Sequence, residues 1–512
     1  MEYAIAVIDI GMTNKKVAVY DDLLRLLDSQ YRDFEPCLKN GLPCHDLDAM
    51  EEWFINVLKT FADKYPIQAI AVSTHGATFV CIGNDGKAAV PCVLYTYEPG
   101  ENFHKRFYER YGEADDLQAS TGTPAFKALI NPAKGIMFAK EQFSDEFKNV
   151  NLILPYPQYW GYRFTGTAGV ESTYMGNHTY LWDQINNKFS SVSGKMGLVS
   201  LIPNKLYKSW DILGTINEKF ADATGLSSDV FVTMGIHDSN STMLPYFAKK
   251  GERGFILNST GTWCVIMNPV KKYMFRSDEL GKVVFFNISA FGTPIKTAIF
   301  LGGQEFKSWS RLFMKKHNRN DSPQWNEDLY RSIINEKNLF LMPELTPGSG
   351  QYPASIARIV EDGKNYYFNP IEDAVIEPLP DESSLAETLP PCFSDYEKCF
   401  AVLRLSLVMQ TITTLERVGI ENGHDIYIEG GFRRDESYNR VLSSAFASNK
   451  VYLTDIAEAT SIGAAMTVKM AITGKNLHDL CNDFEIGYRE QAKSIFEGLH
   501  AYREAWLRET EK

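Results

Sequence analysis

Residues 4–20 read AIAVIDIGMTNKKVAVY, in which two apolar runs flank a polar turn that begins at Gly11. The runs have the composition of buried strands, and the short turn between them indicates a β-hairpin. A strand, a glycine-containing turn and a returning strand can wrap backbone amides around a phosphate group. The stretch therefore predicts a phosphate-holding hairpin in an α/β domain.

The side chains of this hairpin suit a magnesium nucleotide. Asp9 ends the first strand, where its carboxylate can hold a magnesium ion, usually through water. Thr13 and Asn14 can donate hydrogen bonds to phosphate oxygens, and Lys16 adds a positive charge. The alternative is a plain β-turn with solvated lysines, because short motifs of this kind also arise by chance.

A second hairpin of the same kind follows at residues 253–267, RGFILNSTGTWCVIM. The hydroxyls and amides of Thr260, Gly261 and Thr262 can form a nest for the transferred phosphoryl group, although a plain turn is again the alternative. Two such hairpins in one chain indicate two related α/β domains that close on a nucleotide.

Asp238 follows the apolar strand VFVTM (230–234) within the segment GIHDS. A carboxylate at the end of a strand can reach into a cleft as a general base, which is needed wherever a weakly acidic hydroxyl must lose its proton. The alternatives are that Asp238 caps the helix that follows and that His237 is a structural imidazole.

Glycines mark two further candidate sites. Gly430 and Gly431 follow the strand IYIE, where they would let a flat adenine approach the backbone, although a tight strand–helix turn is the alternative. For the pair Gly302-Gly303, as for the segment 458–465, close packing is the alternative to a role in the site. The segment EATSIGAA (458–465) begins a helix whose small residues permit close packing.

The remaining pattern alternates strands and helices. We expect a strand at 67–74, a hairpin at 79–95 around Asn84-Asp85-Gly86, and helices at 48–65, 101–111, 132–143, 217–223, 398–419, 435–447 and 458–472. The proline- and glycine-rich stretch 346–395 predicts an irregular insertion. We place the domain boundary near 245–252, with an N-terminal domain at 1–247 and a C-terminal domain at 248–512.

Net charge, hydropathy and cysteine spacing restrict which ligands and which compartment we expect for the protein. The net charge of −12 opposes binding to nucleic acid or to an anionic membrane. We find neither a signal peptide nor an apolar run of the roughly 20 residues that a membrane helix needs. The 8 cysteines are scattered, which is typical of a reducing compartment. The sequence therefore favours a cytoplasmic enzyme with small-molecule ligands, either a monomer or a homodimer.

Taken in order, the motifs resemble those of the FGGY carbohydrate kinases, a branch of the actin-like ATPase superfamily. The segment 9–14 resembles the first phosphate motif of the family, 258–263 the second, and 429–432 the adenosine motif. GIHDS resembles the catalytic element and EATSIGAA the closing helix. The resemblance extends from residue 4 to about residue 470.

The resemblance implies an α/β protein of two actin-like (ribonuclease H-like) ATPase domains with the active site in the cleft between them. It implies ATP and Mg²⁺ as cofactors, with Asp238 as the base and Asp9 at the metal. The residues that it assigns to ATP are Thr13, Asn14, Lys16, Thr260, Gly261, Thr262, Gly303, Gly430 and Gly431.

Within the family, His237-Asp238 and the run 159–183 look most like the L-rhamnulose and L-fuculose kinases, which phosphorylate the 1-hydroxyl of a deoxyketose. That likeness puts Gly76, Thr78 and His237 beside the sugar. The chain departs from the pattern at Thr78, where those kinases tend to carry Asp, and at 97–99 and 433–434.

We therefore expect an ATP-dependent kinase for a ketose such as L-fuculose or L-rhamnulose. A kinase for another ketose or a polyol, similar to xylulose kinase, is the nearest alternative. A nucleotide-dependent sugar sensor without catalysis is a third hypothesis, against which the retention of both Asp9 and Asp238 argues.

Overall fold

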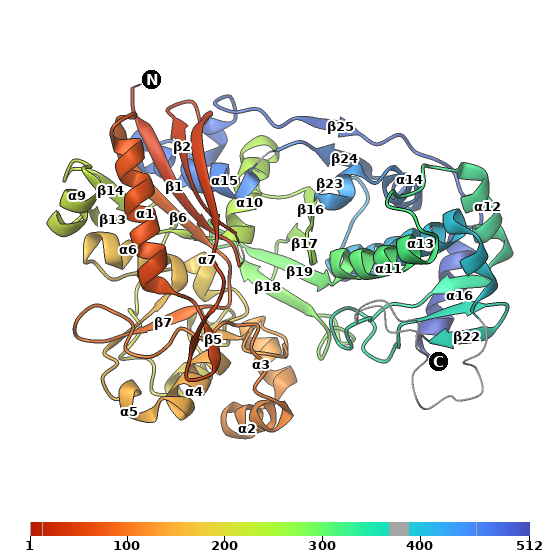
Figure 1. Cartoon of the computed structure of the whole chain (residues 1–512), viewed down its shortest axis with the longest axis horizontal. Helices are drawn as coiled ribbons and strands as arrows, with labels where there is room; N and C mark the ends of the chain where they lie inside the picture. Colours follow the sequence, from red (N-terminus) through yellow and green to blue (C-terminus); the bar gives the residue numbers. More distant parts are fainter. Residues whose placement is uncertain (1, 13, 368–388, 457) are drawn as a thin grey trace.

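The computed structural model describes residues 2–12, 14–367, 389–456 and 458–512. Each half of the chain forms a seven-stranded sheet, and the two sheets lie apart in Figure 1. Helices α10 (Asp238–Lys250) and α15 (Ala459–Thr473) pack together between them. Apolar residues of both sheets and both helices share one buried cluster, so these helices join the two halves.

The first sheet has the order β13-β14-β6-β1-β2-β3, and β15 also pairs with β6. β1, β2 and β3 are antiparallel neighbours, whereas β6 runs parallel to β1 and to β14. The bounds are β1 Ala4–Ile10, β2 Asn14–Asp21, β3 Leu26–Asp33, β6 Ile67–Thr74, β13 Ile212–Thr215, β14 Phe231–Thr233 and β15 Ile236–His237.

The second sheet repeats this topology in the order β18-β19-β17-β16-β23-β24-β25. β16, β17 and β19 are antiparallel neighbours, and β23 and β24 continue parallel to β16. The bounds are β16 Phe255–Thr260, β17 Cys264–Pro269, β18 Val284–Ile288, β19 Pro294–Phe300, β23 Asp425–Gly430, β24 Lys450–Thr454 and β25 Tyr488–Glu490. The predicted similarity of the two halves is thus present in their strand order.

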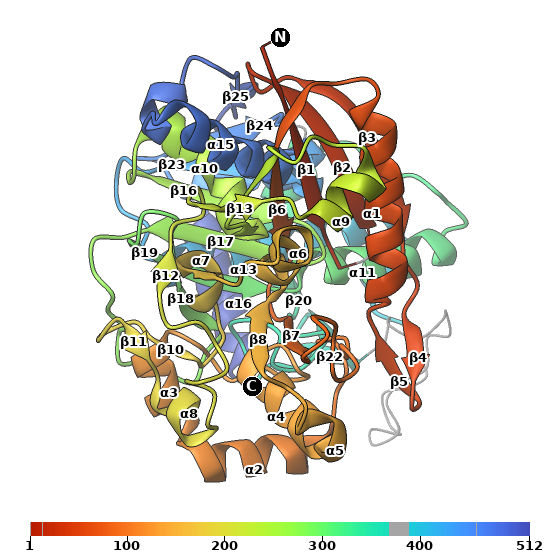
Figure 2. The same ribbon diagram turned by 90° about the vertical axis from the view of Figure 1, so that its left-hand side faces the viewer.

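Alternation of side chains decides what each face of the first sheet buries. Even-numbered residues of β1 pack in the same core as the apolar residues of α1 (Leu47–Ala62), while Ile5 and Val7 pack with α10 and α15. Figure 2 shows α1 and α15 on opposite sides of the sheet. Asp9 belongs to the odd-numbered set, so its carboxylate faces α15.

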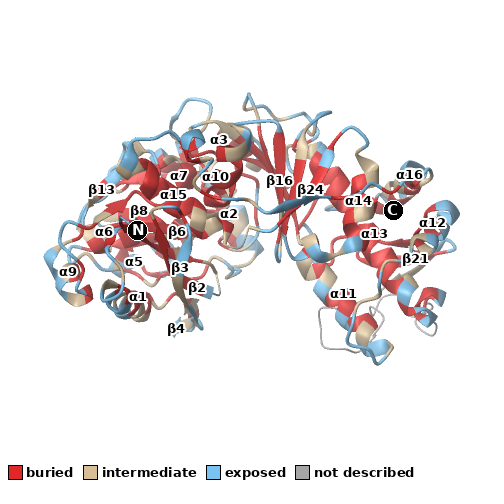
Figure 3. Ribbon diagram, turned by 90° about the horizontal axis from the view of Figure 1, so that it is seen from above, coloured by how far each residue is buried: buried red, intermediate tan, exposed pale blue. Residues whose placement is uncertain are grey.

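The core of the second half is built around α13 (Tyr396–Arg417), which is buried along most of its length. Figure 3 shows both sheets and α13 largely in the colour of buried residues. Among the described residues, α13 is the one helix with the length and hydropathy of a membrane span, and its most apolar window is 94% buried inside the protein. The helices around this core are α11 Gly302–Lys316, α12 Glu327–Glu336, α14 Glu436–Ala445 and α16 Leu499–Thr510.

The outer layer of the first half consists of helices and short strands. The helices are α2 Glu101–Tyr111, α3 Ala114–Thr121, α4 Pro132–Gln142, α5 Ser144–Phe147, α6 Tyr156–Thr165, α7 Ser172–Met175, α8 Ser191–Lys195 and α9 Glu218–Thr224. The strands are β4 Cys37–Lys39, β5 Leu42–Cys44, β7 Phe79–Ile82, β8 Leu152–Pro155, β9 Val170–Glu171, β10 Trp182–Asp183, β11 Lys188–Phe189 and β12 Leu206–Tyr207.

The predicted hairpin at 79–95 forms only around its turn. There the two arms are joined by the bridge between Ile82 and Ala88 and by backbone hydrogen bonds from Ala89 to Cys81 and from Gly83 to Lys87. Along its length β7 pairs instead with β8, about 70 residues later in the chain. The reason is burial: Val80 and Ile82 join the core of the first half, and β8 provides an apolar partner there. The expected helices all form, within a few residues of the predicted ends.

Part of the expected insertion at 346–395 is regular. A small sheet of β20 (Leu339–Leu341), β21 (Arg358–Glu361) and β22 (Lys364–Tyr367) extends into it. The most proline-rich part falls on 368–388, which lie outside the described residues. The domain bounds 1–247 and 248–512 stay a prediction.

Candidate active site

A cavity of about 180 Å³ opens where the two halves of the chain meet. The first half provides the strand ends of β6 and β15 and the start of α10, and the second half provides β17, β18 and β19. Its lining residues are His75, Gly76, Ala77, Tyr95, Phe126, Ile130, Asn177, His178, His237, Asp238, Ser239, Trp263, Val265, Phe285, Asn287 and Ile299. We call it the acceptor cavity.

Asp238 lies in this cavity because of the pairing of β15. That strand runs parallel to the last residues of β6, after a break at Gly235 with a φ of 81°, and Asp238 begins α10 immediately afterwards. Its Oδ1 accepts a hydrogen bond from the Ser239 N–H at 2.5 Å and lies 3.2 Å from His237 Nε2.

The protein around Asp238 favours the protonated carboxyl group. Its side chain keeps 34% of its exposure at the cavity mouth, yet desolvation by the surrounding protein raises its pKa to about 7. The Ser239 hydrogen bonds lower the pKa and the charge of Asp9 raises it. A carboxylate with a pKa near neutrality is suited to general-base catalysis.

Three histidines surround the cavity in their neutral form: His75 and His237 are buried, and His178 is partly buried. Burial lowers the pKa of His75 and His178 to about 4, and that of His237 well below its usual value. His75 donates from Nδ1 to the Gly76 carbonyl at 2.7 Å, which leaves its buried Nε2 as an acceptor with no partner among the described residues. His237 Nε2 also lies 2.7 Å from the Asn177 amide.

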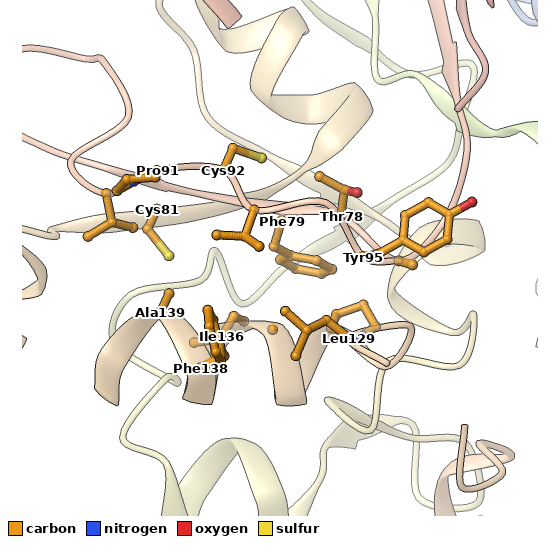
Figure 4. Close-up of a pocket in the computed structure, with 15 residues that line it drawn as sticks. Thr78, Phe79, Cys81, Pro91, Cys92, Tyr95, Leu129, Ile136, Phe138 and Ala139 are labelled. Atoms are coloured by element: carbon orange, nitrogen blue, oxygen red, sulfur yellow. The ribbon is translucent and has the colours of Figure 1, made fainter. Parts of the chain in front are cut away.

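Gly76 and Thr78, both predicted to lie beside the sugar, have different surroundings. A β-carbon on Gly76 would lie 2.8 Å from Asn177 Nδ2 and 3.0 Å from the imidazoles of His178 and His237. Gly76 therefore lines the acceptor cavity closely. Thr78 instead lines a separate cavity of about 40 Å³ between β7 and α4, shown in Figure 4, and its buried hydroxyl has no partner among the described residues.

The first phosphate hairpin brings Asp9 and Lys16 together as direct cross-strand partners. Lys16 Nζ lies 3.3 Å from Asp9 Oδ2, and that oxygen also accepts a hydrogen bond of 2.8 Å from Ser461 in α15. Asn14 is exposed and donates to Asp33 at 2.9 Å. Thr13, the remaining predicted phosphate ligand of this hairpin, lies outside the described residues.

The carboxylate of Asp9 suits a magnesium ion of the kind that accompanies a nucleotide. No cluster of three or more acidic, histidine or cysteine side chains with metal-binding spacing occurs in the described part of the chain. Magnesium in phosphate-transfer sites needs no such cluster, since it is held by one or two carboxylates, water and phosphate oxygens. Asp9 is partly exposed, and its charge raises the pKa of Asp238. One accessible carboxylate beside a phosphate-type hairpin is therefore the kind of site that such a magnesium ion needs.

A larger cavity of about 580 Å³ lies in the second half. It is lined by Thr260, Gly261, Gly303, Phe306, Ser322, Pro323, Gln324, Trp325, Arg404, Gly431, Phe432, Arg434, Asp435, Glu436 and Ser437. Four predicted ATP residues, Thr260, Gly261, Gly303 and Gly431, are thus brought together. Thr262 is exposed on the same turn, and its carbonyl accepts from the Gln304 N–H at 3.2 Å.

Backbone contacts explain why glycine occupies two of the predicted ATP positions, Gly303 and Gly430. Gly430 is not among the described residues that line this cavity. A β-carbon on Gly303 would lie 1.9 Å from the Gly261 carbonyl oxygen, and one on Gly430 would lie 2.1 Å from the Thr260 carbonyl oxygen. Gly430 also has a φ of 79°, which favours glycine. The second phosphate turn is therefore held between the start of α11 and the end of β23.

Sequence patterns missed several residues of both cavities. His75, Tyr95, Asn177 and His178 come from loops, where no periodicity marks them, although His75 stands directly before the predicted Gly76. Two of the three aromatic residues that line the larger cavity, Phe306 and Trp325, were likewise unmarked, whereas Phe432 lies in the predicted motif 429–432. Only the tertiary fold brings these side chains together.

Two sheets of equal topology, each with a phosphate-type hairpin and with a carboxylate-bearing cavity where the halves meet, define an actin-like ATPase fold. A family model described as the FGGY family of carbohydrate kinases, N-terminal domain, matches residues 4–245. A second, carbohydrate kinase FGGY, C-terminal domain, matches residues 252–373. The chain belongs to the FGGY family of carbohydrate kinases and is an ATP-dependent sugar kinase.

Solved structures of the same fold cover nearly the whole chain. A carbohydrate kinase from Novosphingobium aromaticivorans is 24% identical with a TM-score of 0.78, covering 99% of this chain and 98% of that one. A ligand-bound xylulose kinase from Lactobacillus acidophilus is 14% identical, with a TM-score of 0.78 and coverage of 99% and 97%. Glycerol kinase from Plasmodium falciparum with ADP is 15% identical, with a TM-score of 0.74 and coverage of 99% and 97%. A search of curated proteins found no match.

Proposed function

We propose that this kinase transfers the γ-phosphoryl group of ATP to a hydroxyl of a neutral sugar, with Asp238 as the general base. The observation that supports it most is the place of Asp238, in a cavity formed by both halves, with a pKa raised to about 7. The sugar would occupy the acceptor cavity, and ATP the larger cavity behind the second hairpin.

In this mechanism the ionised Asp238 accepts the proton of the sugar hydroxyl as its oxygen attacks the γ-phosphorus. The bond from that phosphorus to the β,γ-bridging oxygen breaks, and ADP leaves with the bonding electrons. His75 Nε2 can accept a hydrogen bond from a second sugar hydroxyl, and Gly76 and His237 border the same sugar. These contacts fix the attacking oxygen in line with the phosphate.

The phosphates of ATP would lie between the two hairpins. Lys16 provides the positive charge, Thr13 and Asn14 provide donors on one side, and Thr260, Gly261 and Thr262 do so on the other. Gly303, Gly430 and Gly431 would border the nucleotide. Asp9 would hold Mg²⁺, which neutralises charge on the phosphate oxygens.

The lining of the acceptor cavity favours a neutral acceptor. No lysine or arginine is among the described residues that line it, so a sugar acid would find no cation there. Phe126, Trp263 and Phe285 form an apolar wall, against which a methyl group packs better than a hydroxyl. We therefore propose the 1-hydroxyl of a deoxyketose such as L-fuculose or L-rhamnulose, phosphorylated in the cytoplasm.

The test is sugar-dependent release of ADP across a panel of acceptors. The panel contains L-fuculose, L-rhamnulose, xylulose, glycerol and gluconate, each at equal concentration with ATP and Mg²⁺. The proposal expects the highest kcat/KM with a 6-deoxyketose and little turnover of gluconate. Preference for xylulose or glycerol would replace the sugar assignment, and failure with every neutral sugar would refute the acceptor class.

A further inference from the structure

A group of charged residues connects the first phosphate hairpin to the start of α15. Lys16 contacts Asp9 at 3.3 Å and also contacts the carboxylate of Glu458. The Tyr31 hydroxyl donates to Glu458 Oε1 at 2.6 Å, and the Lys16 ammonium lies 5.8 Å from the centre of the Tyr31 ring. Glu458 thus reaches from the second half of the chain to β2 and β3 of the first sheet.

The backbone of Glu458 has an unusual conformation for its residue type. Its φ is 70° and its ψ 36°, in the left-handed region that favours glycine. It occupies the N-cap position of α15, yet its side chain makes no capping hydrogen bond there. The carboxylate is directed to Lys16 and Tyr31 instead. A strained residue that gives up a local cap for a distant partner is typical of a functional position.

The carboxylate of Glu458 and a phosphate group of the nucleotide would compete for Lys16. The side chain of Lys16 is only 7% exposed and that of Glu458 is 24% exposed, so the pair is partly shielded from solvent. A phosphate group that approached Lys16 would meet the charge of Glu458 at the same ammonium group. Like charges at such a distance repel, and less water around them strengthens that repulsion.

We propose that Glu458 is a positioning residue that occupies Lys16 in the nucleotide-free enzyme and yields it to the phosphates of ATP. Departure of Glu458 releases the contact of the start of α15 with β2 and β3. Since Ser461, one turn later in α15, holds Asp9, nucleotide binding is thereby coupled to the position of the carboxylate that we assign to magnesium. This inference rests on the proposed phosphate role of Lys16.

The experiment measures the Kd of ADP and of a non-hydrolysable ATP analogue, each with Mg²⁺, by isothermal titration calorimetry. Glu458→Gln removes the competing charge and should tighten binding about two- to fivefold, the range for a partly exposed ion pair. Tyr31→Phe, at a half-exposed residue, removes only the hydrogen bond to Glu458 and should tighten binding less. Glu504→Gln, on the outer face of α16, is the matched control and should not change Kd.

Lys16→Met distinguishes the phosphate role of Lys16 from the competition between Glu458 and phosphate. If it weakens binding while Glu458→Gln and Tyr31→Phe bind no more tightly than the wild type, the competition is refuted and the phosphate role of Lys16 stands. If Lys16→Met binds with wild-type affinity, the phosphate role is refuted together with the inference. A purely structural role of Glu458 predicts weaker binding in Glu458→Gln, which is the opposite sign. Should that variant not fold, Tyr31→Phe decides by the same criterion.

Discussion

A β-carbon added to Gly463 would lie 1.9 Å from the carbonyl oxygen of Ser241, so helices α15 and α10 touch backbone to backbone at this point. The same pair of helices is joined by the Ser241 hydroxyl, which donates to the Thr460 carbonyl at 2.7 Å. Because α10 begins at Asp238 and α15 holds Asp9 through Ser461, this contact fixes the two carboxylates relative to each other.

Gly463→Ala should therefore destabilise the enzyme. The added methyl group meets a backbone oxygen that cannot rotate away, and overpacking of this kind costs about 1–3 kcal/mol. The free energy of unfolding from urea denaturation checks this. Gly194→Ala is the control, since a methyl group added there would have no atom within 4 Å and the backbone of Gly194 is helical. Equal stability of the two variants would contradict the close contact.

Asp238→Asn should lower turnover by orders of magnitude but leave nucleotide binding intact. The amide cannot accept the hydroxyl proton, and loss of a general base lowers rates by roughly 10²–10⁴-fold. The measurements are kcat with the best acceptor and the Kd of ADP. A variant that keeps half of the wild-type kcat would show that Asp238 is not the base. It does not cap α10 either, because His237 occupies the N-cap position and no side chain makes a capping hydrogen bond there.

The wild-type rate should depend on pH through the same carboxyl group. Its pKa is raised to about 7, and the base is active only when ionised, so kcat/KM should fall about tenfold per pH unit below pH 7 and level off above it. Initial rates between pH 5.5 and 8.5 check this. A flat profile down to pH 5.5 would contradict the raised pKa.

Local sequence patterns predict several strands and hairpins, but not all of the strand pairings. The hairpin at β1–β2 and the strand β6 follow from local patterns, because apolar alternation and turn residues act over a few positions. The pairing of β7 with β8 does not, since it depends on a partner far along the chain. Long-range pairing is set by the shared core, which no local pattern reports.

The two neighbouring lysines of β2 show that local patterns are also insufficient to assign the residues of the site. Alternation along the strand places Lys15 and Lys16 on opposite faces, and only Lys16 faces Asp9 and α15. Lys15 is 1% exposed, donates to the Met12 carbonyl at 2.6 Å and has its pKa lowered by burial to about 8. The sequence alone provides the two positive charges, and the register of the strand decides which of them contacts Asp9.

Gly76→Ala should weaken sugar binding selectively. The new methyl group would lie 2.8–3.0 Å from the Asn177 amide and the His178 and His237 imidazoles. These three side chains must therefore shift, which changes the lining of the acceptor cavity. We expect the KM of the sugar to rise at least about tenfold, as for the loss of one buried hydrogen bond, while the Kd of ADP stays the same. An unchanged sugar KM would mean that the acceptor binds elsewhere.

Glu305→Gln tests how burial of a carboxyl group that lines neither cavity affects stability. Glu305 is 3% exposed in α11 and accepts from the Glu344 N–H at 3.0 Å and from the Gln410 amide at 2.8 Å. Burial raises its pKa to about 7, from an ordinary value of 4.5. A group whose pKa is higher in the folded state stabilises the fold most at low pH, below the unfolded pKa. That contribution is lost as pH rises from about 4.5 to 7.

A glutamine at position 305 does not titrate, so the difference in unfolding free energy between Glu305→Gln and the wild type should shift in favour of the variant by about 1 kcal/mol per pH unit between pH 5 and 7. Urea unfolding at pH 5, 6 and 7 measures this difference. Glu504→Gln, at a residue exposed on α16, should show no such trend. A constant difference for Glu305→Gln would mean that the carboxyl group is ionised across this whole range, against the effect of its burial.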